Sequence, residues 1–466
     1  MKIVIIGMGK VGFALASSLS SEGHDITVID NNPKVIEKVE NALDVLPIKG
    51  NAFSTSTLLE AGCDKADLVI TVTDKDEINM LCCLTAKKLG IKRTAARIRD
   101  PQYARELHLI KDDLGLDMVI NPEEASADEI VRLLTIPGAI KIENFAKGRV
   151  RMMELIVKKD MPIVGMQLKS IAALYNIPIL IGAVIRNEAL IVPNGDFRIE
   201  ASDSIYVIGK TAHIYSFSKA LDPSPTKIRN IMIVGGGKIA YYLARLLEQM
   251  HIKVKIIEKD ESICQTLAEA FPQSLIINGD GTDKFLLQSE QISSVDGFIS
   301  LTGSDEANII ASVLAKHFSA KLVITKLSKT HYKEVTNALG LDIIIKPQEI
   351  ITNQILKFVR GQSIEALHRI FSNEGEIIEL VVSKDDPIIG IPLHKLHLIP
   401  DLLIATIVRK NAVVIPTGND ALQAGDRVLI ITKNHITSFK DIITSTGGLV
   451  SELKNSLKKL GNAINM

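Results

Sequence analysis

The sequence is poor in aromatic residues and in cysteine. It has no tryptophan, its aromatic residues amount to 4%, and its four cysteines are Cys63, Cys82, Cys83 and Cys264. The cysteines lie within apolar patterns, without a CxxC motif or a Cys/His spacing that would ligate zinc. This pattern predicts reduced thiols in the core of a cytosolic protein, rather than a disulfide framework or a metal site.

The sequence also lacks a surplus of charge and a long apolar run. Its 54 Lys+Arg residues equal its 54 Asp+Glu residues, which argues against a protein that grips nucleic acid through phosphates. A helix that spans a bilayer needs about 20 consecutive apolar residues. The most apolar stretch, Ile177–Val192, is interrupted by Pro178, Arg186 and Glu188, and the first residues show no signal-peptide pattern. Hydrophobic residues make up 46% of the chain, and we therefore expect them to form buried strands.

What the sequence does contain is an internal duplication. Residues 2–13, KIVIIGMGKVGF, recur as residues 230–241, NIMIVGGGKIAY. The segment TDKDEIN that begins at Thr73 recurs as TGSDEAN, which begins at Thr302. Because the spacing between the matched segments is almost constant, the chain is predicted to consist of two related halves.

A second kind of unit follows each copy of the first. The segment ELIV at 154–157 recurs as ELVV at 379–382, and PIVG at 162–165 recurs as PIIG at 387–390. Each half is therefore expected to contain a larger and a smaller domain. The segment 222–226, DPSPT, is the predicted linker, because two prolines in a short polar stretch cannot continue a helix or a central strand.

The larger domains alternate apolar runs with helical patterns, whereas the smaller ones show several short strands and one short helix. Apolar strands that alternate with helices predict an α/β, Rossmann-like, doubly wound parallel sheet, and the smaller units predict α+β domains. The expected organisation is as follows: Rossmann-like domains at 1–122 and 227–346, helical segments at 123–140 and 347–365, small α+β domains at 141–221 and 366–450, a linker at 222–226 and a tail at 451–466.

The first larger domain carries a glycine-rich turn between its first strand and its first helix. The GxGxxG pattern consists of Gly7, Met8, Gly9, Lys10, Val11 and Gly12. The first glycine allows the tight turn, the second lets backbone N–H groups approach a pyrophosphate, and the third lets helix and strand pack closely. Asp30, at the end of the second strand, can accept hydrogen bonds from ribose hydroxyls and would repel a 2′-phosphate. The turn predicts NAD(H) binding in preference to NADP(H), with a merely structural turn as the alternative.

The second larger domain repeats this turn with one change. It contains Gly235, Gly236, Gly237, Lys238 and Ile239, followed by Ala240 in place of the third glycine. Glu258 takes the place of the acidic residue. We predict a second nucleotide site here, and the alternative is a duplicated domain that kept its fold and lost its ligand.

Further polar residues lie at the carboxyl ends of the predicted strands, which line the same crevice in a doubly wound fold. Asn51 and Asp280 follow the third strands, and Thr73, Asp74 and Thr302 end the fourth. Two cations, Arg97 and Lys326, end the fifth strands, where they are predicted to meet a phosphate. The alternative for each residue is a solvated polar side chain at a loop end.

The sequence shows no set of catalytic or metal-ligating residues. A dehydrogenase needs an acid/base group beside the nicotinamide, but the ten histidines are scattered and none recurs between the halves. His394 and His397 form one short pair without an acidic neighbour. We therefore predict a protein that binds a nucleotide without turning it over, with no catalytic residue and no metal site.

The glycine turn, Asp30, the TDKDEIN segment and the PIVG motif, all repeated, resemble the RCK (regulator of potassium conductance) proteins. The resemblance is closer still to the two-RCK peripheral subunits of bacterial Trk potassium-uptake systems, and it covers essentially the whole chain. It implies a cytoplasmic regulatory protein that docks on a membrane potassium transporter subunit at the inner face of the cell membrane and forms a homo-oligomeric ring. Such proteins bind NAD+ or NADH, and often ATP or ADP, and ligand exchange gates the transporter.

Carried over residue by residue, the resemblance implies two ligand sites. The first uses Gly7–Val11, Asp30, Thr73, Asp74 and Arg97, and the second uses Gly235–Ile239, Glu258, Asp280 and Thr302. Asn51 replaces the family's usual Asp, and Lys326 its usual Arg. The helices near 123–134 and 349–359 resemble the helices that interlock neighbouring RCK units, with burial against their own domain as the alternative. The amphipathic pattern of 451–466 fits a contact with the transporter, with headgroups or with the preceding domain.

Two other functions stay open at this point. An NAD-dependent oxidoreductase would show substrate-dependent oxidation of NADH by the purified chain. A scaffold with vestigial glycine turns would bind no adenine nucleotide even at high concentration.

Overall fold

The computed structural model describes residues 1–221, 227–329, 332–341, 343–360, 364–370 and 374–443. The predicted linker at 222–226 and the predicted tail at 451–466 lie outside the described residues. The described chain forms two compact units: residues 1–135 with 227–356, and residues 136–221 with 357–443. Each unit therefore combines corresponding parts of the two halves of the sequence.

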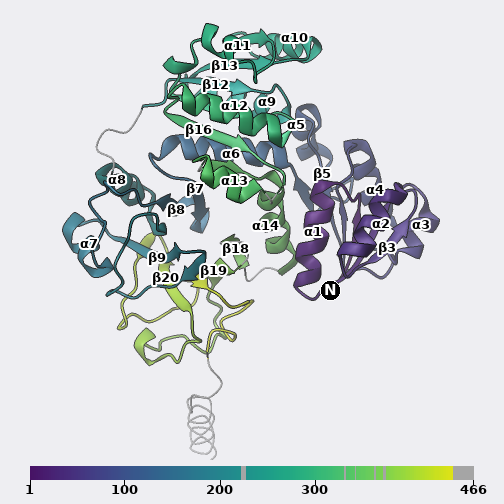
Figure 1. The fold of residues 1–466 in the computed structure, drawn as a ribbon. Helices are drawn as coiled ribbons and strands as arrows, with labels where there is room; N and C mark the ends of the chain where they lie inside the picture. The colour runs from purple at the N-terminus through teal and green to yellow at the C-terminus, as the bar shows by residue number, and fades with distance from the viewer. Residues whose placement is uncertain (222–226, 330–331, 342, 361–363, 371–373, 444–466) are drawn as a thin grey trace, which may run out of the picture. The chain divides into compact units, whose positions relative to one another are not determined.

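The first Rossmann-like domain contains a six-stranded parallel sheet (Figure 1, purple to blue). Its strands are β1 (Lys2–Ile6), β2 (Asp25–Asp30), β3 (Leu46–Lys49), β4 (Leu68–Thr71), β5 (Arg93–Arg97) and β6 (Met118–Ile120). Its helices are α1 (Lys10–Ser21), α2 (Pro33–Ala42), α3 (Thr55–Glu60), α4 (Asp76–Lys88) and α5 (Pro101–Ile110). The strand order β3-β2-β1-β4-β5-β6 reverses direction at β1, so the predicted doubly wound fold is confirmed.

The second Rossmann-like domain repeats this order as β14-β13-β12-β15-β16-β17. Its strands are β12 (Asn230–Val234), β13 (Lys253–Glu258), β14 (Leu275–Asn278), β15 (Gly297–Ser300), β16 (Leu322–Lys326) and β17 (Ile343–Ile345). Its helices are α9 (Lys238–Gln249), α10 (Glu261–Ala270), α11 (Lys284–Ser289), η2 (Ile292–Ser294), α12 (Asp305–His317) and α13 (Lys333–Ala338). The central strands β1, β4, β12 and β15 are almost entirely buried, as expected for strands covered on both faces.

One further helix follows each sheet: α6 (Pro122–Thr135) and α14 (Pro347–Arg360). Helix α6 packs against α9 of the other Rossmann-like domain, so its partner lies in the same chain. The buried apolar residues of these two helices include Ile130, Leu133, Ile355, Leu356 and Val359, whereas Leu134 and Phe358 are half-buried.

Each small domain is a five-stranded antiparallel sheet, which confirms the predicted α+β class. The first has β7 (Lys141–Phe145), η1 (Ala146–Gly148), β8 (Val150–Ile156), α7 (Leu168–Tyr175), β9 (Ile179–Arg186), β10 (Ala189–Ile191), β11 (Ser204–Lys210) and α8 (Thr211–Leu221). The second has β18 (Ile364–Ile370), β19 (Gly375–Val381), η4 (Leu393–Lys395), β20 (Leu402–Arg409), β21 (Ala412–Val414) and β22 (Arg427–Thr432). The sequence analysis did not predict β7 or α8.

The two small domains share one hydrophobic core, to which both sheets contribute. Two glycines mark the closest approach: a methyl group on Gly182 would overlap Ile431, and one on Gly375 would overlap Leu190. In addition, the buried Glu379 accepts a hydrogen bond from the backbone of Ala146, at 2.7 Å. The second unit is therefore held by reciprocal packing between the halves of the sequence.

No helix in the described part of the chain combines the length and the apolarity that crossing a membrane requires.

Candidate functional site

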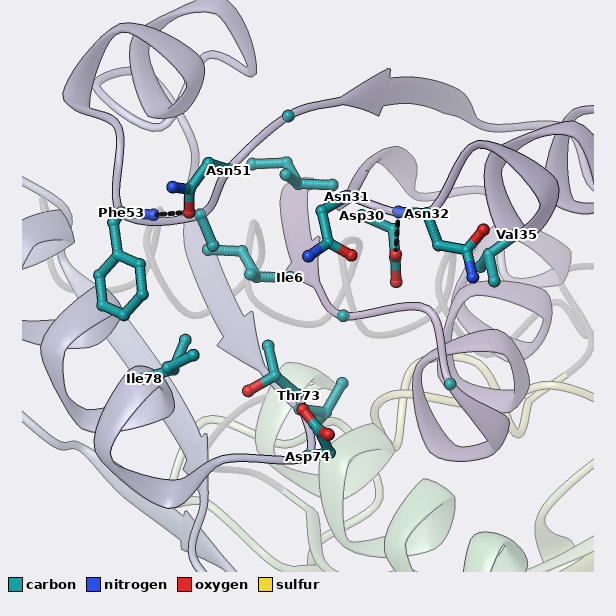
Figure 2. A pocket seen from close by; sticks show the side chains of 16 residues that line it. Ile6, Asp30, Asn31, Asn32, Val35, Asn51, Phe53, Thr73, Asp74 and Ile78 are labelled. Carbon is teal, nitrogen blue, oxygen red and sulfur yellow. Dashed lines mark hydrogen bonds between the residues drawn. The ribbon is translucent and has the colours of Figure 1, made fainter.

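A pocket of about 320 Å³ lies at the carboxyl ends of β1, β2, β3 and β4 (Figure 2). The predicted site residues that line it are Gly7, Gly9, Asp30, Asn51, Thr73 and Asp74. The side chains of Met8 and Val11 are buried in the core, so only their backbone can face a ligand. The pocket thus brings together residues that lie far apart in the sequence, at the sheet's topological switch point.

The glycines of the first turn have different structural roles. Gly7 has a φ of +94°, and a Cβ there would lie 2.8 Å from the backbone nitrogen of Thr73. A Cβ on Gly12 would overlap the carbonyl oxygen of Gly7. These two positions therefore require glycine for the protein's own packing.

Gly9 is different, because nothing in the fold requires a glycine there. Its φ is −65°, and an added Cβ would meet no protein atom within 4 Å. Gly9 is also the N-cap of α1, and no side chain caps this helix end. The same holds for Gly237 at the start of α9, where φ is −67°. An open cradle beside free N–H groups fits the phosphates of a nucleotide.

Asp30 joins the glycine turn to the loop after β2. Its carboxylate accepts hydrogen bonds from the backbone of Met8, at 2.7 Å, and of Asn32, at 2.8 Å. Glu258 makes the same pair of contacts in the second domain, with Gly236 at 2.6 Å and Asp260 at 2.9 Å. Because each carboxylate oxygen has a further lone pair, these residues can shape the turn and still accept a ribose hydroxyl.

Thr73 and Thr302 follow the ends of the fourth strands, β4 and β15, and each is held by an asparagine that the sequence analysis did not single out. The buried Asn79 side chain accepts the backbone N–H of Thr73, at 2.9 Å, and donates to the carbonyl of Arg97, at 2.8 Å. Asn308 repeats these contacts with Thr302 and Lys326. The recurrence of this asparagine in both TDKDEIN-type segments was the available signal.

The loops after β3 and β14 are shaped by Asn51 and Asp280. The Asn51 side chain accepts the backbone N–H of Phe53, at 3.0 Å, and Asp280 accepts that of Thr282, at 2.8 Å. Hydrogen bonds from Thr282 lower the pKa of Asp280. Both predicted residues therefore form the loop itself, and Asn51 also faces the pocket.

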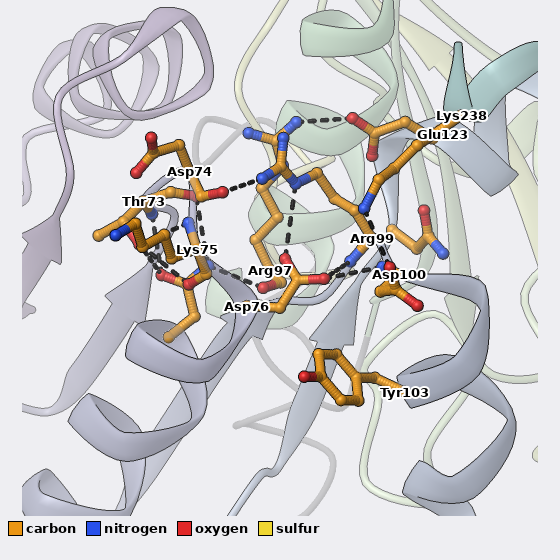
Figure 3. A network of polar contacts seen from close by, with 12 residues as sticks. Thr73, Asp74, Lys75, Asp76, Arg97, Arg99, Asp100, Tyr103, Glu123 and Lys238 are labelled. Carbon is orange, nitrogen blue, oxygen red and sulfur yellow. Dashed lines mark hydrogen bonds and ion pairs between the residues drawn. The ribbon is translucent and has the colours of Figure 1, made fainter. Parts of the chain in front are cut away.

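Arg97 does not line the pocket described above. Its guanidinium lies 2.8 Å from the carboxylate of Glu123, the second residue of α6 (Figure 3). Burial lowers the pKa of Arg97, and its Nε is buried without a hydrogen-bond partner among the described residues. Lys326 is likewise partly buried, and desolvation lowers its pKa. Both cations lie at strand ends, as predicted, but their present partners are protein groups.

A polar network connects the first pocket with the helix that starts at the second glycine turn. The Arg99 guanidinium donates to the carbonyl of Asp74, and the buried Asp76 accepts the backbone N–H of Arg99, at 2.8 Å (Figure 3). The Tyr242 hydroxyl of α9 donates to the carbonyl of Arg99, at 3.0 Å. Lys238, at the start of α9, lies 3.5 Å from the Asp100 carboxylate.

The second glycine turn has the geometry of the first. Gly235 has a φ of +98°, and a Cβ there would lie 2.8 Å from the backbone nitrogen of Thr302. A Cβ on Gly236 would press against Leu267, at 2.7 Å. Ile239 is buried like its counterpart Val11. In both domains, therefore, the turn is open at the glycine that precedes the helix, Gly9 in the first and Gly237 in the second.

Comparison with known proteins identifies the family. Residues 3–122 and 231–347 match the TrkA-N domain, and residues 152–222 and 377–443 match the TrkA-C domain. The chain belongs to the TrkA family. The resemblance to tandem RCK proteins that the sequence predicted is thereby confirmed.

Relatives and solved structures agree with this membership. The chain is 34% identical to "Trk system potassium uptake protein TrkA homolog 1" of Methanosarcina mazei, over 93% of this chain and 97% of that protein. It is also 34% identical to "Trk system potassium uptake protein TrkA" of Haemophilus influenzae, over 92% and 95%. The structure "GsuK channel bound to NAD" superposes with a TM-score of 0.62 at 18% identity, covering 92% of this chain and 76% of that one. At this identity the superposition shows the fold.

Proposed function

We propose that this chain is a nucleotide-sensing regulatory subunit of a Trk-type potassium uptake system. The observation that carries the proposal is the pair of glycine turns, which are open at Gly9 and Gly237 and are each hydrogen-bonded to a strand-end carboxylate. The relatives named for Trk potassium uptake match over nearly their full length. A ligand that binds one conformation better than another shifts the equilibrium between them, and this is how occupancy would control the transporter.

The proposed ligands are NAD+ or NADH, and also ATP or ADP. In the first domain the phosphates would lie on the backbone of Gly7–Val11 and the ribose on Asp30, with Asn51, Thr73 and Asp74 around it. The corresponding groups of the second domain are Gly235–Ile239, Glu258, Asp280 and Thr302. Arg97 and Lys326 would meet a phosphate only by exchanging their present partners, Glu123 and the carbonyl of Leu301, for the ligand.

The proposed role is binding without turnover. Among the described residues that line the first pocket there is no histidine, cysteine or lysine. Its carboxylates belong to Asp30, which is engaged with two backbone N–H groups, and to the exposed Asp74. This composition favours a binding site over a dehydrogenase, since hydride transfer needs a placed acid or base. Oxidation of NADH by the purified chain in the presence of a substrate would overturn this part of the proposal.

The proposed assembly is a ring of copies of this chain beside a membrane potassium transporter, on the cytoplasmic side. Corresponding positions of both Rossmann-like domains expose large apolar side chains: Leu81 and Ile310 are 46% and 51% exposed, and Ile110 and Leu339 are 44% and 42% exposed. Because these positions are apolar and exposed in both repeats, we infer that they contribute to self-association. In light scattering, Leu81→Asp combined with Ile310→Asp should reduce the mass of the assembly.

The binding test uses conservative variants because Asp30 also shapes the turn. Asp30→Asn combined with Glu258→Gln should weaken NADH and ATP binding in calorimetry, whereas the exposed Asp44→Asn should not. Co-purification with a membrane potassium transporter, with and without NADH or ATP, tests the partner. If the wild-type chain bound neither nucleotide, the proposed function would be wrong.

A further inference from the structure

One end of the first pocket is apolar, and two side chains from different elements form it. Phe53 lies in the loop between β3 and α3, and Ile78 lies on α4. Figure 2 shows the Phe53 ring beside Ile78 at one end of the pocket, with Asp30 and Asn32 at the other. The Phe53 side chain is 46% exposed, which is unusual for a phenylalanine that the fold needs for packing.

The position of this apolar end follows from the order of the strands. The phosphates belong at the glycine turn after β1, and the ribose belongs at Asp30 after β2. The next loop in the sheet order β3-β2-β1 is the one after β3, which carries Phe53. The ribose held by an acidic residue at this position is that of the adenosine half of a dinucleotide. A dinucleotide bound in this way would place its adenine beyond Asp30.

The second domain lacks both apolar side chains at the corresponding positions. Thr282 replaces Phe53, and its hydroxyl donates to Asp280, at 2.7 Å, rather than presenting a ring. Ala307 replaces Ile78. The two loops have the same backbone turn, because Asn51 and Asp280 both accept the N–H two residues on. The domains therefore differ in the chemistry of the base position and not in the shape of the loop.

We propose that Phe53 stacks on the adenine base in the first domain, with Ile78 on the opposite side, so that this domain is the tighter adenine-nucleotide site of the chain. The inference rests on the proposed function and adds to it the assignment of the base and of the difference between the sites. Stacking on an aromatic side chain is open to any base, because every base has a π-face, and it contributes substantially to affinity. The chain would thus read nucleotide concentration over two ranges.

The test measures the binding of ATP and of NADH to the full-length chain by calorimetry. The wild type should show a tighter and a weaker class of site. Phe53→Ala should weaken the tighter class about tenfold, and Phe53→Trp should restore it. Tyr215→Ala, an equally exposed aromatic residue on α8 at 46%, is the matched control and should leave both classes unchanged. Thr282→Phe combined with Ala307→Ile should strengthen the weaker class.

The outcomes separate the inference from the function on which it rests. If the wild type binds nucleotide but Phe53→Ala binds it equally well, with an unchanged melting temperature, the stacking assignment is wrong and the proposed function stands. If the wild type shows one class of site with equal affinities, the proposed difference between the domains is wrong. If the wild type binds neither nucleotide, the proposed function fails and the inference fails with it.

Discussion

At the scale of single residues, the glycines of each turn divide into those that the fold needs and one that it does not. Gly7 and Gly12 sit against backbone atoms, whereas the space around Gly9 is free of protein. A glycine that neither the backbone conformation nor the packing requires is best explained by a partner from outside the chain. Within one short motif, Gly7 and Gly12 therefore serve the stability of the fold, and Gly9 serves ligand binding.

This separation can be measured with two alanine variants. Gly12→Ala should lower the free energy of unfolding by about 1–3 kcal/mol, because the new methyl group overlaps the Gly7 carbonyl. Gly9→Ala should leave the free energy of unfolding almost unchanged but weaken ATP and NADH binding, because its methyl group occupies the cradle. Urea unfolding and calorimetry on both variants check this. Equal losses of stability in the two would contradict the assignment.

The thiols of the first domain offer a second test at this scale. Burial raises the pKa of Cys63 and of Cys83 to about 12, and that of Cys82 to about 11. In the native protein near pH 8 these thiols should react with a disulfide reagent far more slowly than in urea. Since their folded pKa lies above the ordinary thiol value of 9.0, their contribution to stability is complete below pH 9 and is lost as the pH rises toward 12. Fast native labelling of Cys83 would contradict its burial.

Much of the pocket follows from the sequence, because its residues are fixed by a motif and by strand ends. The glycine turn and Asp30 were predicted, and both line the pocket or shape it. The roles of Asn79 and Asp76 were not, because a buried polar side chain looks like a solvated one until its partners are known. The ion pair of Arg97 was not predicted either, because its partner Glu123 lies beyond the sixth strand.

At the scale of elements, the main feature is the attachment of α9 to the strand ends of the first domain. Tyr242 is buried there, and its hydroxyl donates to Arg99 while accepting from Asn121, at 2.9 Å. Burial raises the pKa of Tyr242 to about 12. Helix α9 begins at the second glycine turn, so this contact joins one candidate site to the neighbourhood of the other.

Tyr242→Phe tests this contact, because it keeps the ring and removes only the hydroxyl. The variant should lower the free energy of unfolding of the first unit by about 1 kcal/mol, since the partly buried carbonyl of Arg99 loses its donor and the Asn121 amide loses its acceptor. Tyr241→Phe, on the next position of α9, is the matched control and should change it little. Chemical denaturation monitored by circular dichroism measures both. A smaller effect for Tyr242→Phe than for Tyr241→Phe would show that the contact does not stabilise the unit.

Two elements of the first small domain, β7 and α8, were not predicted from the sequence, for different reasons. Strand β7 has only five residues and does not alternate strictly, because the polar Glu143 and Asn144 are neighbours. Its turn into β8 uses positive φ at Ala146 and Lys147 rather than a recognisable Asn-Gly. Helix α8 did carry a signal, because Ile214, Phe217, Ser218 and Leu221 repeat at helical spacing and are buried. The sequence therefore carries no clear pattern for β7, whereas it does carry one for α8.

At the scale of the whole molecule, the duplicated halves do not fold side by side as separate bodies. Like pairs with like: the Rossmann-like domains form one unit and the small domains the other. The chain therefore passes between the units three times, near residues 135, 225 and 356. Repeats in sequence predict the number of domains, but only complementary surfaces, such as Gly182 against Ile431, determine which domains pair.

This pairing predicts that the two halves stay together when the chain is cut between them. A protease site inserted in 222–226 would release residues 1–221 from 227–466, yet both units hold contacts across that cut. One unit contributes the α6–α9 packing and the other the core shared by the small-domain sheets. The cleaved halves should co-elute in gel filtration and melt near the temperature of the intact chain.

Adding Gly182→Val, whose side chain would collide with Ile431, should weaken their association, while Gly195→Val, at a more open position, should not. Separation of the cleaved wild-type halves would show that the units are not held by these surfaces.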